Sequence, residues 1–432
     1  MTEFEVQPTR VLVPRLTGYG VQFNHHVFAK ISREVGVTEQ NVGQMESKVL
    51  LLRPQFVRIF FHHSAFADED RMSSFQRAVE LAERANATIN ITWQGGKATP
   101  ERNMARFAEV LAGLANDPGG ANVKWVTVSN EVNRTKITPA ENEAMYRMLD
   151  RHLRQAGVRE HLRFMGGDLT QEHQERWFTH MGTHMQDILD AYSVHIYWDY
   201  RQTQKFADRL DEVRRIVAGL PQPGRKPLFV TEFGVRGIKD TGLPIPGRHA
   251  DGTPIGKTNV AGFQQAWFNI LAAQRGYPGT AKWDCYFGKY DKGIQAHYAI
   301  GRPQDGWPLF PAFSALRLFA AATEPDWHVV DVKHDGPPTT KQLAAYTDAN
   351  GQRTVIGLDT RGAQLNGTSS EQVGYDIGGL PPNKRFQLVV WNRNGHGHNT
   401  LGAPVTTSSA GVAHVVAPLH SVFALTTKQV SV

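Results

Sequence analysis

Residues 123–130, VKWVTVSN, are a short run of apolar and β-branched residues, and residues 139–156, PAENEAMYRMLDRHLRQA, carry apolar residues at helical spacing. A short apolar run of this kind is typical of a buried strand, and the second pattern is typical of an amphipathic helix. The two segments therefore predict one β-strand followed by one α-helix.

The same unit repeats on both sides of this stretch. The apolar runs lie at residues 18–23, 56–61, 88–94, 123–130, 162–167, 189–197, 227–233 and 280–287. Helical spacing is found at residues 72–86, 101–116, 139–156, 204–220 and 261–275, with 50–52 in the first helical segment and 311–322 in the eighth. Eight β-then-α units in succession predict an α/β fold, a (β/α)8 TIM barrel. We expect this barrel to span residues 15–322.

The connections between the predicted elements are unequal in length. Two helix-to-strand connections, 155–157 and 275–278, are short. The strand-to-helix connections at 234–260 and 288–307 are long and rich in glycine and proline. In a TIM barrel, long loops after the strands form the face that carries the active site. The sequence therefore predicts a functional site at the carboxyl ends of the strands.

After residue 322 the pattern changes to short strands separated by turns. These strands are expected at residues 327–333, 342–348, 354–358, 372–377, 385–392, 411–416 and 421–427. Such a series is typical of a small β-sandwich. Residues 4–12 alternate weakly and are expected to add a strand to it, so the second domain is predicted to comprise residues 1–14 plus 323–432. Because no low-complexity linker joins the two domains, we expect them to pack rigidly.

The composition excludes several classes of protein. The chain has 432 residues, of which 41% are hydrophobic and 20% are charged, as in ordinary globular proteins. No apolar run approaches the roughly 20 residues needed to cross a bilayer, so we expect no membrane partner. The net charge is +6, but Lys and Arg are scattered and no nucleic-acid-binding motif is present, so we expect no nucleic-acid partner.

Two further features concern the compartment and the redox state. Residues 1–5, MTEFE, lack the basic start and apolar core of a secretory signal. We therefore expect a cytoplasmic protein, or a secreted one from which the signal has been removed. Cys285 is the single cysteine, so no intramolecular disulfide is expected, and its apolar surroundings predict a buried core residue. The oligomeric state is left open.

A glutamate follows the fourth and the seventh predicted strands. Residues 126–133 read VTVSNEVN and place Glu131 at the end of one strand, while residues 228–234 read LFVTEFG and place Glu232 at the end of the other. A retaining glycosidase needs two carboxyl groups about 5–5.5 Å apart, one to protonate the leaving oxygen and one to attack the anomeric carbon. Either glutamate alone could equally form a salt bridge at the barrel rim. The pair, on strands that face each other across the barrel mouth, favours catalysis.

These two motifs resemble the paired signatures of clan A glycoside hydrolases. The resemblance rests on Asn130-Glu131 and on Thr231-Glu232-Phe233-Gly234, and it covers residues 15–322. Within the clan, the chain is similar to families 5, 30, 39 or 51. It implies that Glu131 is the general acid/base, that Glu232 is the nucleophile and that Asn130 binds the 2-hydroxyl of the substrate. The appended sandwich resembles that of families 30, 39 and 51. Val132 departs from the pattern, because many members have proline after the acid/base glutamate.

Other residues at the strand ends are candidates for supporting roles. Arg58 lies within the apolar run 56–61, where a buried cation needs a partner. Glu232 is the expected partner, and another acid is the alternative. His195 and Tyr197 alternate on the sixth strand and therefore share a face. The resemblance implies that they orient the nucleophile and line the sugar site, and that Trp283 is an aromatic platform under the sugar.

The remaining candidates are weaker. Trp93 at the end of the third strand, His63 after the second and Asn24 after the first are predicted substrate-binding residues, although core positions would read similarly. Asp168 after the fifth strand either binds a hydroxyl or caps the fifth helix, and we favour the cap.

A metal site is not expected, and neither is a cofactor. His25/His26 and His62/His63 are adjacent pairs, and neighbouring side chains point apart in extended structure. No His-Glu-x-x-His motif is present, so a zinc hydrolase is not favoured.

The sequence therefore predicts a retaining O-glycoside hydrolase that acts on an oligo- or polysaccharide. By analogy with most clan members, we expect a β-linked substrate. In this role the pKa of Glu131 should be raised, partly by the charge of Glu232. The alternatives are a non-catalytic carbohydrate-binding barrel and a transglycosylase that uses the same residues. The sugar, the choice between exo and endo action, and the exact family are left open.

Overall fold

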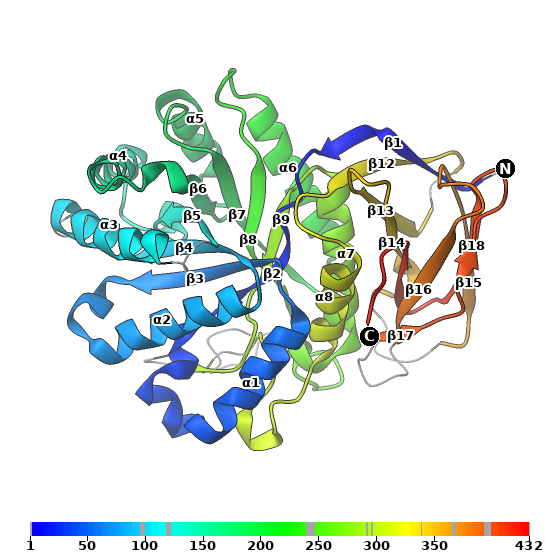
Figure 1. Cartoon of the computed structure of the whole chain (residues 1–432), viewed down its shortest axis with the longest axis horizontal. Coiled ribbons are helices and arrows are strands. Elements are labelled where there is room, and N and C mark those ends of the chain that lie inside the picture. The colour runs from blue at the N-terminus through cyan, green and yellow to red at the C-terminus, as the bar shows by residue number, and fades with distance from the viewer. Residues whose placement is uncertain are drawn as a thin grey trace.

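The computed structural model describes residues 2–95, 100–117, 122–238, 247–290, 293–294, 297–337, 339–364, 369–392 and 399–431. Parts of the two long predicted loops, 239–246 and 291–292 with 295–296, lie outside these residues. The described residues form a closed barrel and a second sheet beside it (Figure 1).

The predicted barrel is confirmed. Eight parallel strands close in chain order: β2 (Gly18–Phe23), β3 (Phe56–His62), β4 (Thr88–Gln94), β5 (Val123–Val128), β6 (Arg163–Leu169), β7 (Ala191–Asp199), β8 (Leu228–Arg236) and β9 (Gly279–Lys282). β9 ends five residues before the predicted end of its run, because the backbone after Lys282 leaves the barrel to form the wall described below. A short hairpin of β10 (Lys289–Tyr290) and β11 (Gly293–Ile294) lies in the loop that follows.

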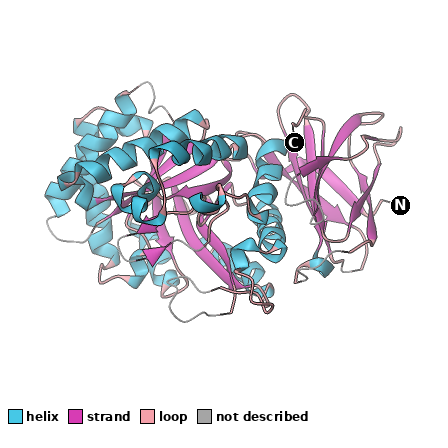
Figure 2. Ribbon diagram, turned by 90° about the horizontal axis from the view of Figure 1, so that it is seen from below, coloured by secondary structure: helices cyan, strands magenta, loops and turns pink. Residues whose placement is uncertain are grey.

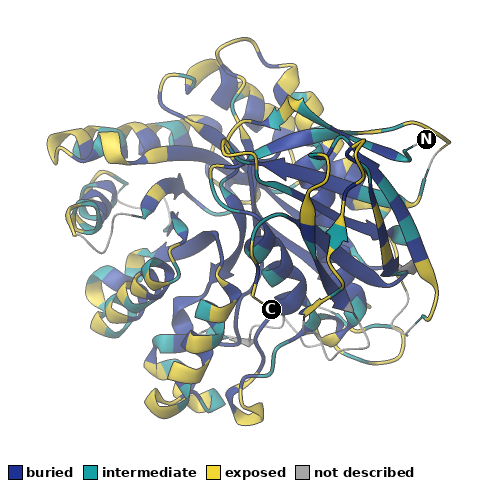
Figure 3. Cartoon of the chain, turned by 45° about the vertical axis from the view of Figure 1, so that its right-hand side comes forward, coloured by how far each residue is buried: buried dark blue, intermediate teal, exposed yellow. Residues whose placement is uncertain are grey.

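Helices surround the barrel, and the outward faces of most of them are exposed, whereas the last two are almost wholly buried (Figure 3). They are α1 (Glu39–Leu52), α2 (Glu69–Arg84), α3 (Pro100–Asn116), α4 (Pro139–Gln155), α5 (Gln174–His184), α6 (Gln204–Ala218), α7 (Asn259–Gln274) and α8 (Pro311–Ala322). α4 begins at a capping box in which the Thr138 side chain accepts from the Glu141 N–H, and proline occupies the first turn, where it costs no hydrogen bond. Among the described residues, none of the helices has the length and apolar character required to span a membrane.

The second sheet is built from both ends of the chain. Its strands are β1 (Phe4–Val13), β12 (His328–His334), β13 (Lys341–Thr347), β14 (Arg353–Asp359), β15 (Gln372–Gly378), β16 (Arg385–Asn392), β17 (Asn399–Leu401), β18 (Val405–Thr406), β19 (Ala413–Pro418) and β20 (Ser421–Thr426). The hydrogen-bonded order is β17-β16-β20-β14-β13-β12-β1-β15-β19, with β18 on β16. β1 is antiparallel to β12 and parallel to β15. The expected N-terminal strand is therefore present and joins strands that are distant in sequence.

This continuous sheet folds over to form two layers around an apolar interior. Phe4 of β1, Phe386 of β16, Val415 of β19 and Phe423 of β20 all belong to one buried cluster. Side chains alternate across a strand, so the opposite face of the sheet is free to pack elsewhere. The arrangement is the predicted sandwich (Figure 2).

The other face of the sheet packs on the barrel through α7 and α8, which lie between the two parts (Figure 1). Phe263 and Phe319 of these helices share an apolar cluster with Tyr346 and Trp391 of the sheet. Within this cluster the buried hydroxyl oxygens of Tyr19 and Tyr346 are 2.5 Å apart. Barrel and sheet are thus joined by a common core. We keep residues 15–322 and 1–14 plus 323–432 as the proposed extents of the two domains.

Candidate active site

Arg58 is the centre of a polar cluster at the carboxyl ends of the barrel strands. Its side chain projects from β3 and is 0% exposed. It donates to Thr92 Oγ1 at 3.0 Å, Gln22 Oε1 at 3.0 Å, Glu232 Oε2 at 3.0 Å, Asn130 Oδ1 at 2.7 Å and Asp168 Oδ2 at 2.5 Å. A buried guanidinium needs this degree of pairing, because an uncompensated charge in the interior is costly. The predicted ion pair with Glu232 is confirmed, and Asp168 is a second partner.

Glu232 lies on β8 and has both carboxylate oxygens bound. Oε2 accepts from Arg58, and Oε1 accepts from the Tyr197 hydroxyl at 2.5 Å. β8 has one extra residue relative to β7 between Val230 and Glu232, so Thr231 and Glu232 both reach the cluster. Two hydrogen bonds, one from a cation, fix this carboxylate in one orientation.

Glu131 follows β5 in a left-handed backbone conformation, with φ 45°. Its Oε1 lies 3.2 Å from His195 Nδ1, and its Oε2 accepts from Arg134 at 3.2 Å. The side chain is 23% exposed, against 8% for Glu232. A ligand-capable oxygen of each glutamate and a His195 ring nitrogen all lie within 4.8 Å of one another. Glu131 is therefore the solvent-facing member of a close carboxylate pair.

His195 lies between three carboxylates. Its ring nitrogens are 3.2 Å from Glu131, 3.8 Å from Glu232 and 3.8 Å from Asp168. Burial would lower the pKa of His195, but the Glu232 charge and the contacts to Asp168 and Glu131 raise it to about 9. The imidazole therefore holds a proton at neutral pH.

The raised pKa that the sequence predicted for Glu131 is wrong for this structure. Burial favours a raised pKa, but the hydrogen bond and the charge of His195, with the charge of Arg134, hold the pKa of Glu131 below its ordinary value. That expectation left out the protonated imidazole of His195, which faces a Glu131 oxygen.

Asp168 is not a helix cap, so the interpretation favoured from sequence is wrong. α5 begins after His173, which has no side-chain capping bond, whereas Asp168 is 0% exposed and points into the barrel. Its Oδ1 accepts from Ser193 at 2.6 Å and from Thr231 at 2.5 Å. Burial would raise the pKa of Asp168, but the Arg58 charge and the His195 contact hold it well below its usual range. Asp168 thus supports both Arg58 and His195, a role that its place at a strand end alone did not reveal.

The wall beside this cluster contains Trp283, which is 9% exposed. Its ring centroid lies 6.0 Å from that of Phe60 and 6.4 Å from that of Tyr290. Tyr290 donates to Asn24 Oδ1 at 2.7 Å, and Asn24 Nδ2 donates to Asp284. Burial raises the pKa of Asp284 well above its usual value, which favours the neutral acid. Asn24 and Trp283 therefore lie in one wall, and Asp284 and Tyr290 are members that sequence reasoning missed.

Two of the predicted substrate-binding residues lie elsewhere. Trp93 is 0% exposed and packs outside the barrel strands with Phe61, Phe66 and Phe107, so its predicted substrate contact is wrong. The physical reason is strand alternation: Thr92 faces Arg58 in the interior, so the next side chain faces the helices. His63 is exposed, and its described contact is Nδ1 to the Gln94 carbonyl oxygen at 3.4 Å, apart from the carboxylate pair.

The expectation that neighbouring histidines point apart is wrong for one pair. His25 and His26 lie in a 3-10 helix, η1 (His25–Phe28), rather than in extended structure. Their rings are nearly parallel with centroids 4.6 Å apart, and His62 at the end of β3 completes a group of three.

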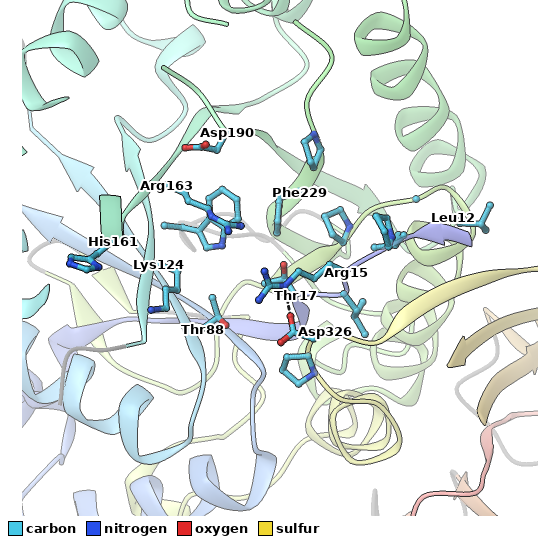
Figure 4. Close-up of a pocket in the computed structure, with 18 of the residues that line it drawn as sticks. Leu12, Arg15, Thr17, Thr88, Lys124, His161, Arg163, Asp190, Phe229 and Asp326 are labelled. Carbon is cyan, nitrogen blue, oxygen red and sulfur yellow. Dashed lines mark hydrogen bonds and ion pairs between the residues drawn. The ribbon is translucent and has the colours of Figure 1, made fainter. Parts of the chain in front are cut away.

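Two cavities lie at opposite ends of the barrel. One of about 570 Å³ lies beside the carboxylate pair and is lined by Glu131, His195 and Tyr197 together with Arg134 and Arg236. The larger one, about 940 Å³, lies at the opposite end of the barrel, where the strands begin (Figure 4). Its charged side chains include Arg15, Lys124, Arg163 and Asp190. Volume alone would select the wrong end, because the paired carboxylates occupy the carboxyl face.

Comparison with known proteins finds similar structures but no protein with a matching sequence. No protein-family model matches the chain, and no curated protein matches it. The α-L-arabinofuranosidase from Thermotoga maritima, solved as an arabinose complex, superimposes with a TM-score of 0.70 at 13% identity over 99% of this chain and 100% of that one. The family 51 arabinofuranosidase from Xanthomonas axonopodis pv. citri gives 0.68 at 11% identity, covering 99% and 100%.

A third similar structure is the catalytic domain of the family 30 xylanase C from Talaromyces cellulolyticus, with a TM-score of 0.67 at 10% identity over 99% of this chain and 100% of that one. These likenesses extend over the barrel and the appended sheet together. The chain therefore has the two-domain fold of these structures, a TIM barrel with a β-sandwich at its side.

Proposed function

We propose that the chain is a retaining glycoside hydrolase in which Glu232 is the nucleophile and Glu131 is the general acid/base. The observation that carries this proposal is the close carboxylate pair, with oxygens within 4.8 Å of each other. This spacing fits the about 5–5.5 Å of retaining enzymes and leaves too little room for the water that an inverting mechanism places between the carboxyl groups. The shared fold of the arabinofuranosidase and xylanase structures is consistent with it.

In the first step Glu232 attacks the anomeric carbon while the glycosidic oxygen leaves. Arg58 and Tyr197 hold the attacking carboxylate in position through one hydrogen bond to each of its oxygens. As the covalent bond forms, one Glu232 oxygen loses its charge, and Asp168 keeps Arg58 compensated. Asn130 uses its carbonyl oxygen for Arg58, so its amide N–H groups are the part suited to a sugar hydroxyl.

Departure of the leaving group requires a proton on Glu131. In the free protein this proton is on His195, whose Nδ1 faces Glu131 Oε1 at 3.2 Å. A sugar bound over Glu131 removes water from its carboxylate, which disfavours the charged form and draws the proton onto it. After the leaving group departs, Glu131 is a carboxylate again and activates the water that releases the sugar.

The substrate is a carbohydrate with an O-glycosidic linkage. The similar structures include enzymes named for arabinofuranosides and for xylan, so aryl arabinofuranosides and xylosides are the first substrates to test. A β-linkage stays a prediction by analogy. The cavity beside Glu131 has room for a sugar acceptor in place of water. Products are therefore compared with and without added sugar to separate hydrolysis from transglycosylation.

The test measures turnover of aryl glycosides by Glu232→Gln and by a matched control. We expect Glu232→Gln to lose on the order of 10⁴-fold or more in kcat, because the amide cannot attack. Glu172→Gln alters another carboxylate that lines the same cavity but is not in the Arg58 cluster, and it should keep kcat within a few fold. Turnover by Glu232→Gln equal to that of the control would reject the assignment. Absence of turnover in the unaltered protein across a broad glycan screen would favour a binding barrel instead.

A further inference from the structure

Three histidines from two segments meet behind the Trp283 wall. His25 and His26 come from η1 after β2, and His62 comes from the end of β3. One ring nitrogen of each lies within 4.8 Å of the other two. This group is separate from the Glu131 and Glu232 pair, and the proposed function makes no use of it.

The spacing of the rings is that of imidazoles around one ion. Their centroids are 4.6, 5.5 and 5.9 Å apart. A tetrahedral ion with metal–nitrogen bonds of about 2.0–2.1 Å places bound imidazole centroids about 5 Å apart. The nitrogens would have to approach to about 3.3 Å. The His25 and His26 rings, whose planes are only 20° apart, would also have to turn so that their nitrogens point to one ion.

His25 gives a second, independent indication. It is 1% exposed, yet neither ring nitrogen has a hydrogen-bond partner among the described residues. A buried polar group left unsatisfied is costly, so something is expected to fill this position. An imidazole binds a metal through a ring nitrogen that carries no proton, and neither ring nitrogen of His25 is engaged by a described residue.

The aromatic residues that contact these histidines connect them to the wall of the carbohydrate site. The His26 ring contacts that of Tyr290 edge-on, with centroids 4.6 Å apart, and Tyr290 bonds Asn24 in the wall of the carbohydrate site. His62 contacts Phe60, which in turn contacts Trp283. An ion held here would link the end of β3 to the segment after β2 and fix the wall from behind.

We propose that His25, His26 and His62 form a binding site for one divalent ion of the zinc class. Three imidazoles with no carboxylate among them favour Zn²⁺, or Co²⁺ as its spectroscopic substitute, over Mg²⁺ and Ca²⁺, which prefer oxygen ligands. The role is structural, and the proposal stands whether or not the glycosidase assignment does.

The experiment titrates the chelator-treated full-length protein with Co²⁺ and, separately, with Zn²⁺. We expect one equivalent to bind, with the visible absorption of a tetrahedral Co²⁺ site and a rise in Tm. His62→Gln changes the least buried of the three ligands and should weaken the Kd by more than about 100-fold while leaving the circular dichroism unchanged. His25→Gln is the second variant and should have the same effect.

The chain offers a matched control for adventitious binding. His180 and His184 lie one helical turn apart on the exterior of α5 with ring centroids 4.6 Å apart, a spacing that can capture ions at a surface. His184→Gln should keep the one equivalent and its Co²⁺ spectrum. Loss of binding in His184→Gln with full binding in His62→Gln would overturn the proposal. So would the absence of stoichiometric binding by the unaltered protein.

Discussion

At the scale of single residues, Arg58 compensates two carboxylates that could not otherwise be buried together. It pairs with Asp168 at 2.5 Å and with Glu232 at 3.0 Å, and its own side chain is 0% exposed. Removing one partner of a buried ion pair costs about 3–5 kcal/mol, because the remaining charge is uncompensated. We expect Arg58→Met to lower the free energy of unfolding by this amount, as measured by urea denaturation.

The control for this prediction is Arg134→Met. Arg134 also bonds a site glutamate, but its side chain is 55% exposed, so the loss should stay within about 1 kcal/mol. Equal losses in the two variants would mean that the Arg58 cluster contributes no more than a surface pair.

The protonation of His195 leads to a second prediction at this scale, for the pH dependence of kcat/KM. Its raised pKa means that the proton shared with Glu131 is kept until the pH rises through about 9. We expect kcat/KM to fall above that pH, and His195→Asn to move this alkaline limb to lower pH because Glu131 alone releases its proton sooner. An alkaline limb at the same pH in His195→Asn would show that the imidazole does not hold the proton.

The raised pKa of His195 also affects the stability of the protein. Because the folded pKa of His195 is above its ordinary value of 6.5, its contribution to stability is complete below pH 6.5 and is lost as the pH rises through about 9. The Tm of the unaltered protein should therefore decline over this interval. His195→Asn should show a shallower decline in the same calorimetric series.

The site could be predicted from sequence where chemistry follows strand position. Glu131 and Glu232 each end a recognisable strand, and Arg58 needed a buried acid as partner. The outward direction of Trp93 could also have been predicted, because Thr92 faces the barrel interior and successive side chains alternate. Asp168 could not be oriented in this way, since β6 carries one extra residue relative to β7 between Gly166 and Leu169, and such a bulge leaves no sequence signal.

At the scale of elements, the close approach of β2 and β3 depends on Gly20. A Cβ at this position would lie 1.5 Å from the carbonyl oxygen of Phe56, so any side chain must push the two strands apart. We expect Gly20→Ala to lower the free energy of unfolding by at least about 1–3 kcal/mol, the usual cost of overpacking a core.

Gly43 provides the opposite case in α1. A Cβ there meets nothing within 4 Å, and alanine is the better helix former, so Gly43→Ala should stabilise by about 0.5–1 kcal/mol. Urea denaturation of both variants gives the comparison. Destabilisation by Gly43→Ala, or no effect of Gly20→Ala, would contradict these contacts.

Element prediction succeeded for the long periodic segments and failed where short segments depend on tertiary contacts. The barrel strands and the large helices follow from apolar spacing. β17 and β18 have three and two residues and were missed, because their pairing with β16 determines them and their own composition does not. The 3-10 geometry of His25 and His26 could not be predicted from the sequence either. The group that these two residues form with His62 was therefore missed.

At the scale of the whole molecule, the barrel and the sandwich share a core. Tyr346 is fully buried between them, and its hydroxyl meets that of Tyr19. We expect Tyr346→Ala to cost about 3–5 kcal/mol and to shift a single cooperative unfolding transition in calorimetry, because a large buried aromatic group is lost from both parts at once. Two transitions, of which only one moves, would show that the parts unfold independently.

The sequence predicted two rigidly packed domains without a low-complexity linker, but not the order of the second sheet. β1 lies between β12 and β15, and β20 lies between β14 and β16. The β1 pairings join residues more than 300 positions apart, and the β20 pairings join residues tens of positions apart. A strand's own pattern does not specify its neighbours. For β1, the weak alternation predicted only that residues 4–12 would add a strand to the sandwich.

The central claim, that Glu232 attacks the sugar while Glu131 acts as acid and base, is tested most directly by azide rescue with product anomers identified by NMR. In Glu131→Ala, azide replaces the water of the second step and should give a glycosyl azide of retained configuration. In Glu232→Ala, azide replaces the nucleophile and should give the inverted glycosyl azide. Inverted product from Glu131→Ala, or retained product from Glu232→Ala, would contradict the account.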